Sequence, residues 1–377
     1  MKIAINAAFF QPKGGGIREY IDNLVNNLHD LNVSHEIIVY VLQDQLPFAK
    51  EHFPEGIRLK TIPFNSKNLA DRIKRSLFEG SFWKREEKIE KFDIFHSPFF
   101  HAPSLRKAKI LLTVHDLRLY RFPETYEYLR YQFLKRRVRS SIRKADHIIS
   151  ISEFTRREIK ELCGVEDEKV TVIPEAINKS RFSVDKTKRP KNLDSGVTSG
   201  RFILAVGHIE PRKNYDRLMD AFEIVRQKGA LSDLQLVIVG KQDHSFKETI
   251  DRINATPGIH YLNFLDGSEL NWLYAKASLF VFPSYYEGFG FPPLEAASLG
   301  TLSAVSNVSS IPEVCGDGAY YFDPYNVQEM ASVIETAISD KEGAEAILNK
   351  MKERIDEFSW KRNVEETIKV YDKLNKK

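Results

Sequence analysis

The sequence lacks most features that mark membrane, secreted or nucleic-acid-binding proteins. No apolar run approaches the roughly 20 residues that a bilayer-spanning helix needs, and the first residues, MKIAINAAFFQPKGGG, lack the long apolar core of a signal peptide. Its two cysteines, Cys163 and Cys315, lie far apart, which favours free thiols in a reducing cytoplasm over a disulfide. The formal net charge of +4 is too small to indicate a nucleic-acid partner. We therefore expect a cytoplasmic protein that binds no nucleic acid.

What the chain does have is an alternation of short apolar runs with segments of helical periodicity. KIAINAAFF, HEIIVYVL, KILLTVHDL and DHIISIS are typical of strands, and amphipathic segments such as IREYIDNLVNNLHDL lie between some of them. The pattern restarts after residue 200 with RFILAVGHI, LQLVIVG and SLFVFPS. This alternation predicts an α/β protein whose parallel sheets are covered by helices on both faces.

The length of 377 residues exceeds what one hydrophobic core usually serves. Segment 186–200 has no apolar periodicity and is predicted to link two Rossmann-like domains, residues 1–185 and 201–358. Open parallel sheets bind ligands at the carboxyl ends of their strands. Two such domains are therefore expected to form a ligand-binding cleft.

Two glutamates stand out in the stretch PSYYEGFGFPPLEAASLG, because Glu287 and Glu295 are separated by Gly288, Gly290 and two prolines. Glycine favours irregular backbone and proline suits a helix's first turn, so we expect Glu287 on a loop and Glu295 in the first turn of a helix. There Glu295 can accept hydrogen bonds from a vicinal diol such as a ribose, beside a helix N-terminus that favours an anion. In the alternative interpretation, Glu295 only offsets the helix dipole and Glu287 is solvated.

Arg212 and Lys213, in AVGHIEPRKNYDRL, follow the first strand of the second domain. Adjacent cations in a strand-to-helix loop can neutralise a diphosphate, and arginine can bind it through two parallel hydrogen bonds. A plain surface charge is the alternative. Because both loops follow strands of one sheet, these cations and the two glutamates are expected to meet the same nucleotide diphosphate.

The first domain offers weaker candidates. Gly14 to Gly16 end at a predicted helix, where their amides could contact a phosphate or form a simple turn. His115 and Asp116 follow the apolar residues of LTVHDL, and a polar pair at a strand end is typical of a site, although a structural role stays open.

Taken together, these motifs resemble those of the family-4 retaining glycosyltransferases of GT-B fold, which use nucleotide sugars. The similarity runs nearly end to end through TVHD, ISISEFTRREI, KVTVIPEAI, VGHIEPRKN, EGFGFPPLEA, SSIPEVCGDGAYYFDP and FSWKRNVEETIKVY. The resemblance implies two Rossmann-like domains that face each other across a cleft. It assigns the acceptor to domain 1–185 and the nucleotide sugar to domain 201–358, and it implies that a terminal helix within 359–377 returns to the first domain.

The resemblance also implies roles for single residues. Glu295 resembles the glutamate that holds the ribose hydroxyls, and Glu287 the one that orients the donor sugar. Arg212 and Lys213 resemble the cations that stabilise the departing diphosphate, and His115 resembles a histidine beside the transferring sugar. The remaining positions expected to contact the donor are glycines and neighbouring aromatic residues: Gly15, Gly16, Gly207, Gly288, Phe289, Gly290 and Phe291.

The forms IEPRKN and YYEGFGFPPLEA resemble the mannosyltransferase-like branch that builds O-antigen and other cell-surface polysaccharides. They imply a retaining hexosyltransferase with GDP-mannose as the leading donor, UDP- or dTDP-sugars as alternatives, and no metal or other cofactor. Two positions depart from the family pattern. His208 stands where many relatives have arginine, and Glu175 with Ala176 stands where many have Asn-Gly.

The acceptor is expected to be a glycan or a polyprenyl-diphosphate-linked glycan at the inner face of the cell membrane. RIKRSLFEGSFWKREEK and RYQFLKRRVRSSIRK mix basic and aromatic residues, which favours peripheral contact with an anionic membrane, with a solvated helix face as the alternative. Two other functions stay open. A nucleotide-sugar epimerase of the same fold would consume the donor without an acceptor, and a two-domain sugar-binding protein would not turn it over.

Overall fold

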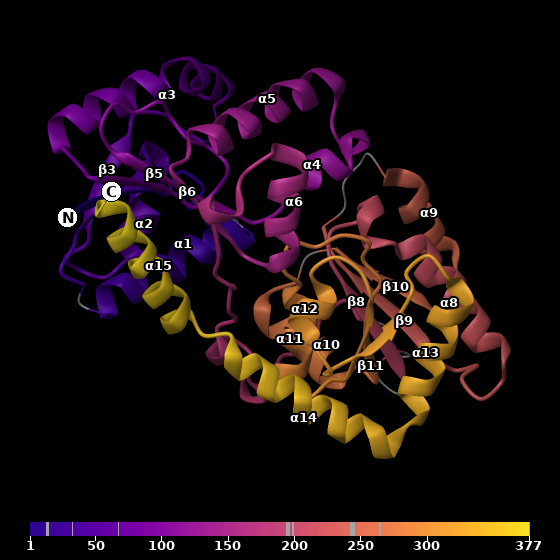
Figure 1. Cartoon of the computed structure of the whole chain (residues 1–377). Helices are drawn as coiled ribbons and strands as arrows, with labels where there is room; N and C mark the ends of the chain where they lie inside the picture. Colours follow the sequence, from indigo (N-terminus) through magenta and orange to yellow (C-terminus); the bar gives the residue numbers. More distant parts are fainter. Residues whose placement is uncertain are drawn as a thin grey trace. The chain divides into compact units, whose positions relative to one another are not determined.

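The computed structural model describes residues 1–12, 15–31, 33–66, 68–193, 197, 200–241, 246–263 and 265–376. The chain forms two compact units (Figure 1). Unit 1 comprises Met1–Glu175 together with Ser359–Lys377, and unit 2 comprises Ala176–Phe358. Each unit contains one parallel sheet with helices packed against it, which confirms the predicted α/β class.

The sheet of unit 1 has seven strands in the order β3-β2-β1-β4-β5-β6-β7. Every neighbouring pair is parallel. The chain builds outward first on one side of β1 and then on the other, so the strand order reverses between β1 and β4, where such sheets bind ligands. The strands are β1 Lys2–Asn6, β2 Glu36–Leu42, β3 Arg58–Ile62, β4 Ile94–Ser97, β5 Lys109–Val114, β6 His147–Ser150 and β7 Val170–Val172.

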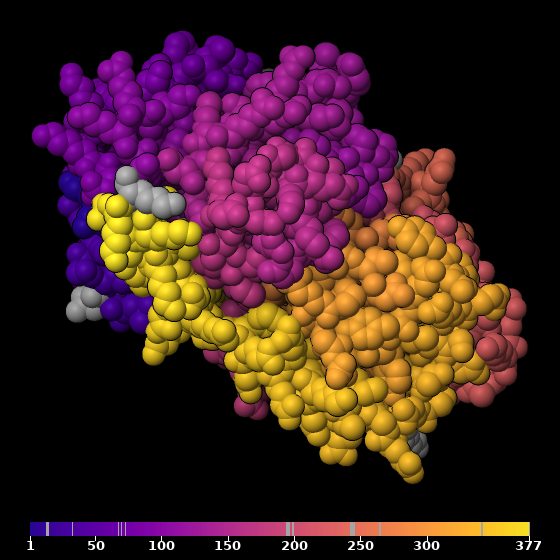
Figure 2. Space-filling view, in the orientation of Figure 1, coloured from indigo at the N-terminus to yellow at the C-terminus, as the bar shows by residue number. Residues whose placement is uncertain are grey.

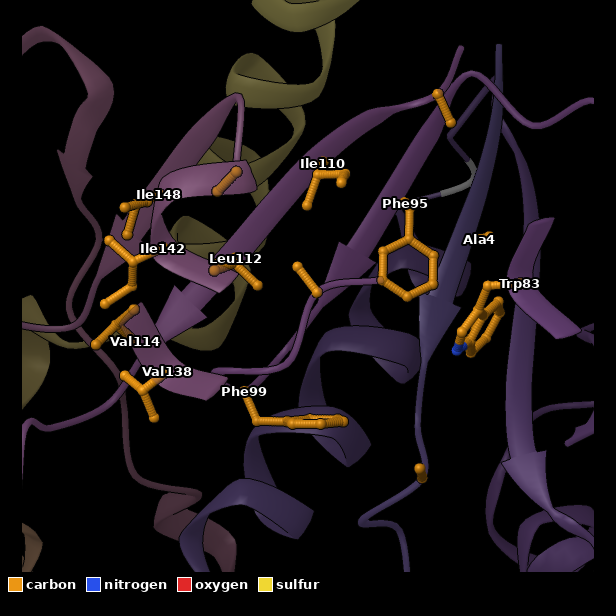
Figure 3. Packing of buried hydrophobic residues seen from close by; sticks show 14 of the residues in the cluster. Ala4, Trp83, Phe95, Phe99, Ile110, Leu112, Val114, Val138, Ile142 and Ile148 are labelled. Carbon is orange, nitrogen blue, oxygen red and sulfur yellow. The ribbon is translucent and has the colours of Figure 1, made fainter. Parts of the chain in front are cut away.

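One face of this sheet packs against α3 and α5, and the shared core is seen in Figure 3. Trp83 of α3 packs edge-on against Phe95 of β4, at 4.7 Å between ring centroids. Val138 and Ile142 of α5 belong to the same buried cluster. The helices of unit 1 are α1 Gly16–Asp30, α2 Leu46–His52, α3 Leu69–Glu90, α4 Arg118–Arg121, α5 Tyr128–Lys144, α6 Glu153–Cys163 and α15 Trp360–Asn375.

The last helix, α15, is part of unit 1 although it follows unit 2 in the chain. In Figure 2 its yellow surface lies against indigo and purple residues of the N-terminal unit. The attachment is specific, because the Tyr371 hydroxyl lies 2.6 Å from His96 Nδ1 and the Trp360 ring packs edge-on against Tyr20. Ring packing and a buried hydrogen bond therefore hold the chain terminus to unit 1.

The sheet of unit 2 has six parallel strands in the order β10-β9-β8-β11-β12-β13. Its strand order reverses between β8 and β11. The strands are β8 Phe202–Val206, β9 Gln235–Val239, β10 Ile259–Leu262, β11 Leu279–Phe282, β12 Ser303–Ser306 and β13 Tyr320–Phe322. The helices are α8 Tyr215–Gln227, α9 Lys247–Ala255, α10 Gly267–Lys276, α11 Phe291–Ser298, α12 Ile311–Cys315, α13 Val327–Ser339 and α14 Lys341–Glu357.

The boundary between the units differs from the prediction. The first domain was expected to extend to residue 185, with a linker over 186–200, but unit 2 begins at Ala176. The physical reason is that this segment is tied to α10. The side chain of Asn271 donates a hydrogen bond to the carbonyl of Arg181, and the Lys188 amide donates to the carbonyl of Ser268. The described part of 186–200 is therefore assigned to unit 2.

None of the helices in the described ranges combines the length and apolarity required to span a bilayer. Cys163 and Cys315 are buried and are not joined by a disulfide. Burial raises the pKa of the Cys315 thiol to about 12, which keeps it protonated near neutral pH.

Candidate functional site

The main candidate site lies in unit 2, at the carboxyl ends of the two strands between which the sheet order reverses. Arg212 and Lys213 belong to a short 3-10 helix, Pro211–Lys213, that follows β8. Glu287 lies in the loop after the neighbouring strand β11. Adjacent parallel strands deliver both loops to one sheet edge, so residues 74 or more positions apart in the chain come together there.

The carboxylate of Glu287 is shared by both cations. Lys213 Nζ lies 2.6 Å from Glu287 Oε1, and Arg212 Nη1 lies 2.8 Å from Oε2. Arg212 also donates to the carbonyl of Tyr286 at 2.9 Å, and its Nη2 lies 2.6 Å from Glu210 Oε1. The predicted cations and the first predicted glutamate therefore form one contact network, which Glu210 completes with a second negative charge.

Because this network is buried, the pKa values of Glu287 and Lys213 depend strongly on the charges around them. Burial by itself would raise the pKa of Glu287, but the charges of Arg212 and Lys213 outweigh it and lower the pKa to about 2. Burial lowers the pKa of Lys213, and the charge of Glu287 offsets this only in part. The ammonium also lies 5.0 Å from the centroid of the Phe282 ring. The charged state of Lys213 thus depends on Glu287.

Three polar residues that the sequence patterns did not identify hold these loops in place. The Ser309 hydroxyl accepts a hydrogen bond from the Glu287 amide, and the Ser310 hydroxyl donates to the carbonyls of Glu287 and Phe289. Asn214, in the left-handed conformation at φ 59°, donates to the carbonyls of Pro283 and Pro324. These contacts join the loops after β8, β11, β12 and β13. The sequence signal available for the two serines was a cluster of small polar residues, SNVSS, after a strand.

The glycines of the site have different local roles. Gly290 precedes α11 with a φ of +115°, a conformation that L side chains rarely adopt. A Cβ on Gly207 would lie 2.8 Å from Lys213 Cε, so a side chain there would displace the lysine. Gly288 directly precedes Phe289, whose buried ring packs edge-on against Phe358. The aromatic predicted beside it, Phe291, is the first residue of α11, and its ring lies 5.0 Å from that of Phe289.

Glu295 lies on α11, on a different element from Glu287, as predicted. Its expected position in the first helical turn is wrong, because α11 begins at Phe291 and Glu295 is its fifth residue. Pro292 and Pro293 occupy the first turn and have no N–H to offer an anion. The Tyr274 hydroxyl donates a hydrogen bond to Glu295 Oε2 at 2.9 Å. The carboxylate is therefore held in one orientation by α10.

The candidate in unit 1 is His115, directly after β5. Its Nδ1 lies 2.5 Å from Glu175 Oε1, and its Nε2 lies 2.9 Å from the carbonyl oxygen of Pro98. An ionised Glu175 and the carbonyl of Pro98 are both acceptors, and an imidazolium, which carries two N–H groups, satisfies both at once. Burial by itself would lower the pKa of His115, but the charge and hydrogen bond of Glu175 raise it above its ordinary value. Glu175, one of the two departures from the family pattern, thus fixes the histidine.

Beneath His115 lies a buried chain of hydrogen bonds that the sequence did not reveal. The Thr113 hydroxyl lies 3.2 Å from the Tyr20 hydroxyl and 2.9 Å from His96 Nε2, and His96 Nδ1 contacts Tyr371. Burial, with a smaller contribution from the positive charge of His115, lowers the pKa of His96 to about 3. His96 is therefore neutral at physiological pH and joins α1, β5 and α15 in the core of unit 1.

The other predicted residues of unit 1 lie at the start of α1. Gly15 precedes this helix and Gly16 is its first residue, whereas Gly14 lies outside the described residues. Gly15 has a φ of −92°, and a Cβ on either glycine would meet nothing within 4 Å. Neither the backbone conformation nor local packing explains glycine here. Contact with a ligand stays a prediction for this loop.

We expect Glu175→Gln to lower the pKa of His115 below the ordinary histidine value. The amide oxygen of glutamine can still accept the Nδ1 hydrogen bond, but the negative charge that opposes burial is lost. NMR titration of the imidazole carbons measures this directly in both proteins. An unchanged His115 pKa in the variant would show that Glu175 does not hold the histidine in its charged form.

The comparisons with known proteins agree with this architecture. Residues 14–181 match the family model described as Glycosyltransferase Family 4, and residues 191–356 match the one described as Glycosyl transferases group 1. Among curated proteins, the chain is 28% identical over 285 residues to the O-antigen chain mannosyltransferase B of Escherichia coli, with 74% of each chain covered.

Solved structures share the fold across the whole chain. Sucrose-phosphate synthase from Thermosynechococcus elongatus superposes with a TM-score of 0.75 at 18% identity and covers 99% of both chains. The Anabaena protein HepE, solved in complex with UDP-glucose, superposes with a TM-score of 0.71 at 16% identity and covers 99% of this chain and 100% of its own. At these identities the likeness establishes the two-unit α/β fold.

Proposed function

Because this chain belongs to the family-4 glycosyltransferases of GT-B fold, we propose that it transfers a hexose from a nucleotide sugar to a glycan or lipid-linked glycan with retention of configuration. Mannose from GDP-mannose is the donor we favour. The 28% identity to an O-antigen chain mannosyltransferase supports this choice, together with a role in cell-surface polysaccharide synthesis.

The observation that carries the proposal is the buried network of Arg212, Lys213 and Glu287 at the switch point of the unit 2 sheet. Ligands of open parallel sheets bind at this position. Its two cations supply the charge that a diphosphate requires, and Glu287 holds both of them in place before a ligand arrives. Preorganised charge of this kind is effective because it needs no rearrangement during the reaction.

In the proposed reaction, the bond between the sugar's anomeric carbon and the diphosphate oxygen breaks while an acceptor hydroxyl attacks from the same face. The diphosphate then gains negative charge, and Arg212 and Lys213 would stabilise it. Since Glu287 and Glu210 already contact these cations, an incoming diphosphate would compete with the carboxylates for their N–H groups. Among the described residues, no three histidine, cysteine, aspartate or glutamate side chains gather as a metal site would need, and our proposal assigns the leaving-group charge to the two cations.

Glu295 is the residue we assign to the ribose hydroxyls. Its Oε2 accepts from Tyr274, and the second oxygen of a carboxylate has lone pairs that can accept from a diol. The segment between Glu287 and Glu295 includes Gly288, Phe289, Gly290 and Phe291. We propose that the backbone of these residues contacts the phosphates or the sugar of the donor.

For unit 1 we propose contact with an anionic membrane, where a lipid-linked acceptor would be found. Large apolar side chains are exposed on α3 and α5, including Leu77 at 69% and Leu129 at 81% of their accessible surface. Arginines and lysines of the same helices surround them. Exposed apolar residues within a basic surface are typical of proteins that bind anionic lipid.

The test is ligand-observed NMR with a panel of nucleotide sugars, comparing the wild-type protein with Glu295→Ala. We expect one donor to bind and to release its nucleoside diphosphate slowly, and we expect the variant to bind that donor at least about tenfold more weakly, because a charge-assisted contact is lost. Glu335→Ala is the matched control, since Glu335 lies on the surface of the same unit in an ion pair with Lys228.

Each other outcome has a defined meaning. Wild-type affinity in Glu295→Ala would remove the ribose assignment. Conversion of the donor into an isomeric nucleotide sugar without acceptor would indicate an epimerase. Binding with no turnover, even with polyprenyl-linked glycan present, would indicate a binding protein and overturn the proposed transferase.

A further inference from the structure

A cavity of about 330 Å³ lies in unit 1 between α3 and α5, and none of the residues assigned above to the reaction lines it. Leu77 and Lys84 of α3 and Phe133, Arg137 and Lys144 of α5 line it, together with His101 from the segment after β4. The cavity therefore brings exposed apolar groups and cations together on one surface.

Apolar residues and cations share one face of each helix. On α3, Ile73, Leu77, Lys84 and Lys88 follow one another at spacings of four, seven and four residues, which places them on one face. On α5, Phe133, Arg137 and Lys144 share a face in the same way. On α3 the apolar residues of this face come before the cations, whereas on α5 Phe133 lies between Arg130 and Arg137. The cavity is lined by parts of both stretches.

The side chains that line the cavity carry more positive than negative charge. Glu79 is buried at its base, with Arg137 Nη2 at 3.2 Å and Arg75 Nε at 3.8 Å from its Oε2. Lys84 and Lys144 are exposed and form no ion pair with any residue that the structure describes. Two positive charges in the cavity are thus available to a ligand.

A polar atom of the lining is also available. His101 Nδ1 is buried, lies 3.6 Å from Glu79 Oε1, and has no hydrogen-bond partner in the described part of the chain. A second cavity of about 860 Å³ shares Lys84 and continues past further basic side chains, among them Lys88, Lys107 and Lys109. The basic surface therefore extends beyond the first cavity, past Lys88 of α3.

We propose that this cavity binds the phosphate of an anionic membrane phospholipid, with Lys84, Arg137 and Lys144 around the headgroup and Leu77 and Phe133 against its acyl chains. The proposal rests on the membrane contact proposed above for unit 1 and gives it a defined site. An apolar protein surface would bury Lys84 and Lys144 without partners, which is costly. A nucleic acid would leave Leu77 and Phe133 uncovered. An amphiphile with an anionic head matches both halves of the surface.

The experiment measures cosedimentation of the full chain with vesicles of phosphatidylcholine alone and of phosphatidylcholine mixed with phosphatidylglycerol. We expect binding only to the mixed vesicles, and we expect K84Q/K144Q to weaken it about tenfold or more, since each basic residue near an anionic surface contributes about 1 kcal/mol. K50Q/K361Q is the matched control, because it removes the same charge from exposed positions on α2 and α15. L77S/F133S should also weaken binding, because both side chains are exposed and are expected to enter the lipid.

Three results would overturn the phospholipid site. Equal weakening in K84Q/K144Q and K50Q/K361Q would show diffuse attraction without a site. Binding of free sn-glycerol 3-phosphate that is lost in K84Q/K144Q, with vesicle binding unchanged, would assign the cavity to a soluble phosphate. No binding of wild-type protein to mixed vesicles would remove the membrane contact altogether. Donor turnover in solution, which none of these variants should change, reports separately on the proposed transferase.

Discussion

Lys213→Ala should reduce turnover by about 10² to 10³, the loss that follows removal of one preorganised charge contact from a transition state. The ammonium of Lys213 lies 2.6 Å from Glu287 and is almost fully buried, so water cannot replace its charge at full strength. If it acts on the departing diphosphate, the loss should fall on kcat, with a smaller change in KM. Steady-state kinetics with the identified donor and acceptor measure both.

The same substitution leaves Glu287 with Arg212 alone, and breaking a buried ion pair destabilises proteins by about 3 to 5 kcal/mol. Urea unfolding of the variant must therefore accompany the kinetics, so that turnover is expressed per folded molecule. Lys228→Ala is the matched control, because Lys228 is an exposed cation of the same unit, paired with Glu335. Turnover close to wild type in folded Lys213→Ala would contradict the leaving-group assignment.

The sequence predicts the fold well because parallel sheets impose a strong local pattern. Strands such as β1, with IAI, and β9, with LVIV, are buried on both faces and contain continuous apolar runs, which separate them from the amphipathic helices between them. The glycines and prolines of EGFGFPPLEA correctly place Glu287 and Glu295 on different elements. Local patterns also place Arg212, Lys213 and Glu287 at strand ends, and neighbouring strand ends share a sheet edge.

What local patterns could not provide is the pairing of residues distant in the sequence. His115 and Glu175 are separated by 60 positions, and their contact depends on the register of β5, β6 and β7. The sequence predicted only that Glu175 follows a strand, and it contained no further indication that Glu175 pairs with His115. The domain boundary was missed for a similar reason, because the segment after Ala176 has little periodicity of its own and is ordered by contacts with α10.

The same limit applies to the electrostatics of the main site. The family resemblance implied that Glu287 orients the hydroxyls of the donor sugar, and the sequence pattern predicted that Arg212 and Lys213 meet the diphosphate. In the structure both carboxylate oxygens of Glu287 contact these cations. A role of Glu287 in positioning the cations is therefore at least as direct as a role on the sugar, and one substitution separates the two.

Glu287→Gln should make turnover strongly dependent on pH. Glutamine keeps the shape of the side chain, but it removes the negative charge that supports the ammonium of Lys213, whose pKa burial already lowers. The pKa of Lys213 should then fall further, while Arg212 stays charged because guanidinium does not deprotonate in proteins. Turnover near neutral pH should drop by about 10² to 10³, as for loss of the lysine charge.

The sign of the pH effect distinguishes the two roles of Glu287. If Glu287 keeps Lys213 protonated, lowering the pH restores the ammonium in the variant, so its turnover relative to wild type should rise as the pH falls. If Glu287 acts on the sugar hydroxyls, the ratio should stay constant with pH. A double variant, K213M/E287Q, provides an independent check, because residues that act through one another give losses that do not add. A ratio independent of pH, together with additive losses, would show that Glu287 acts on the donor sugar. Glu210 and the diphosphate would then be the partners of the two cations.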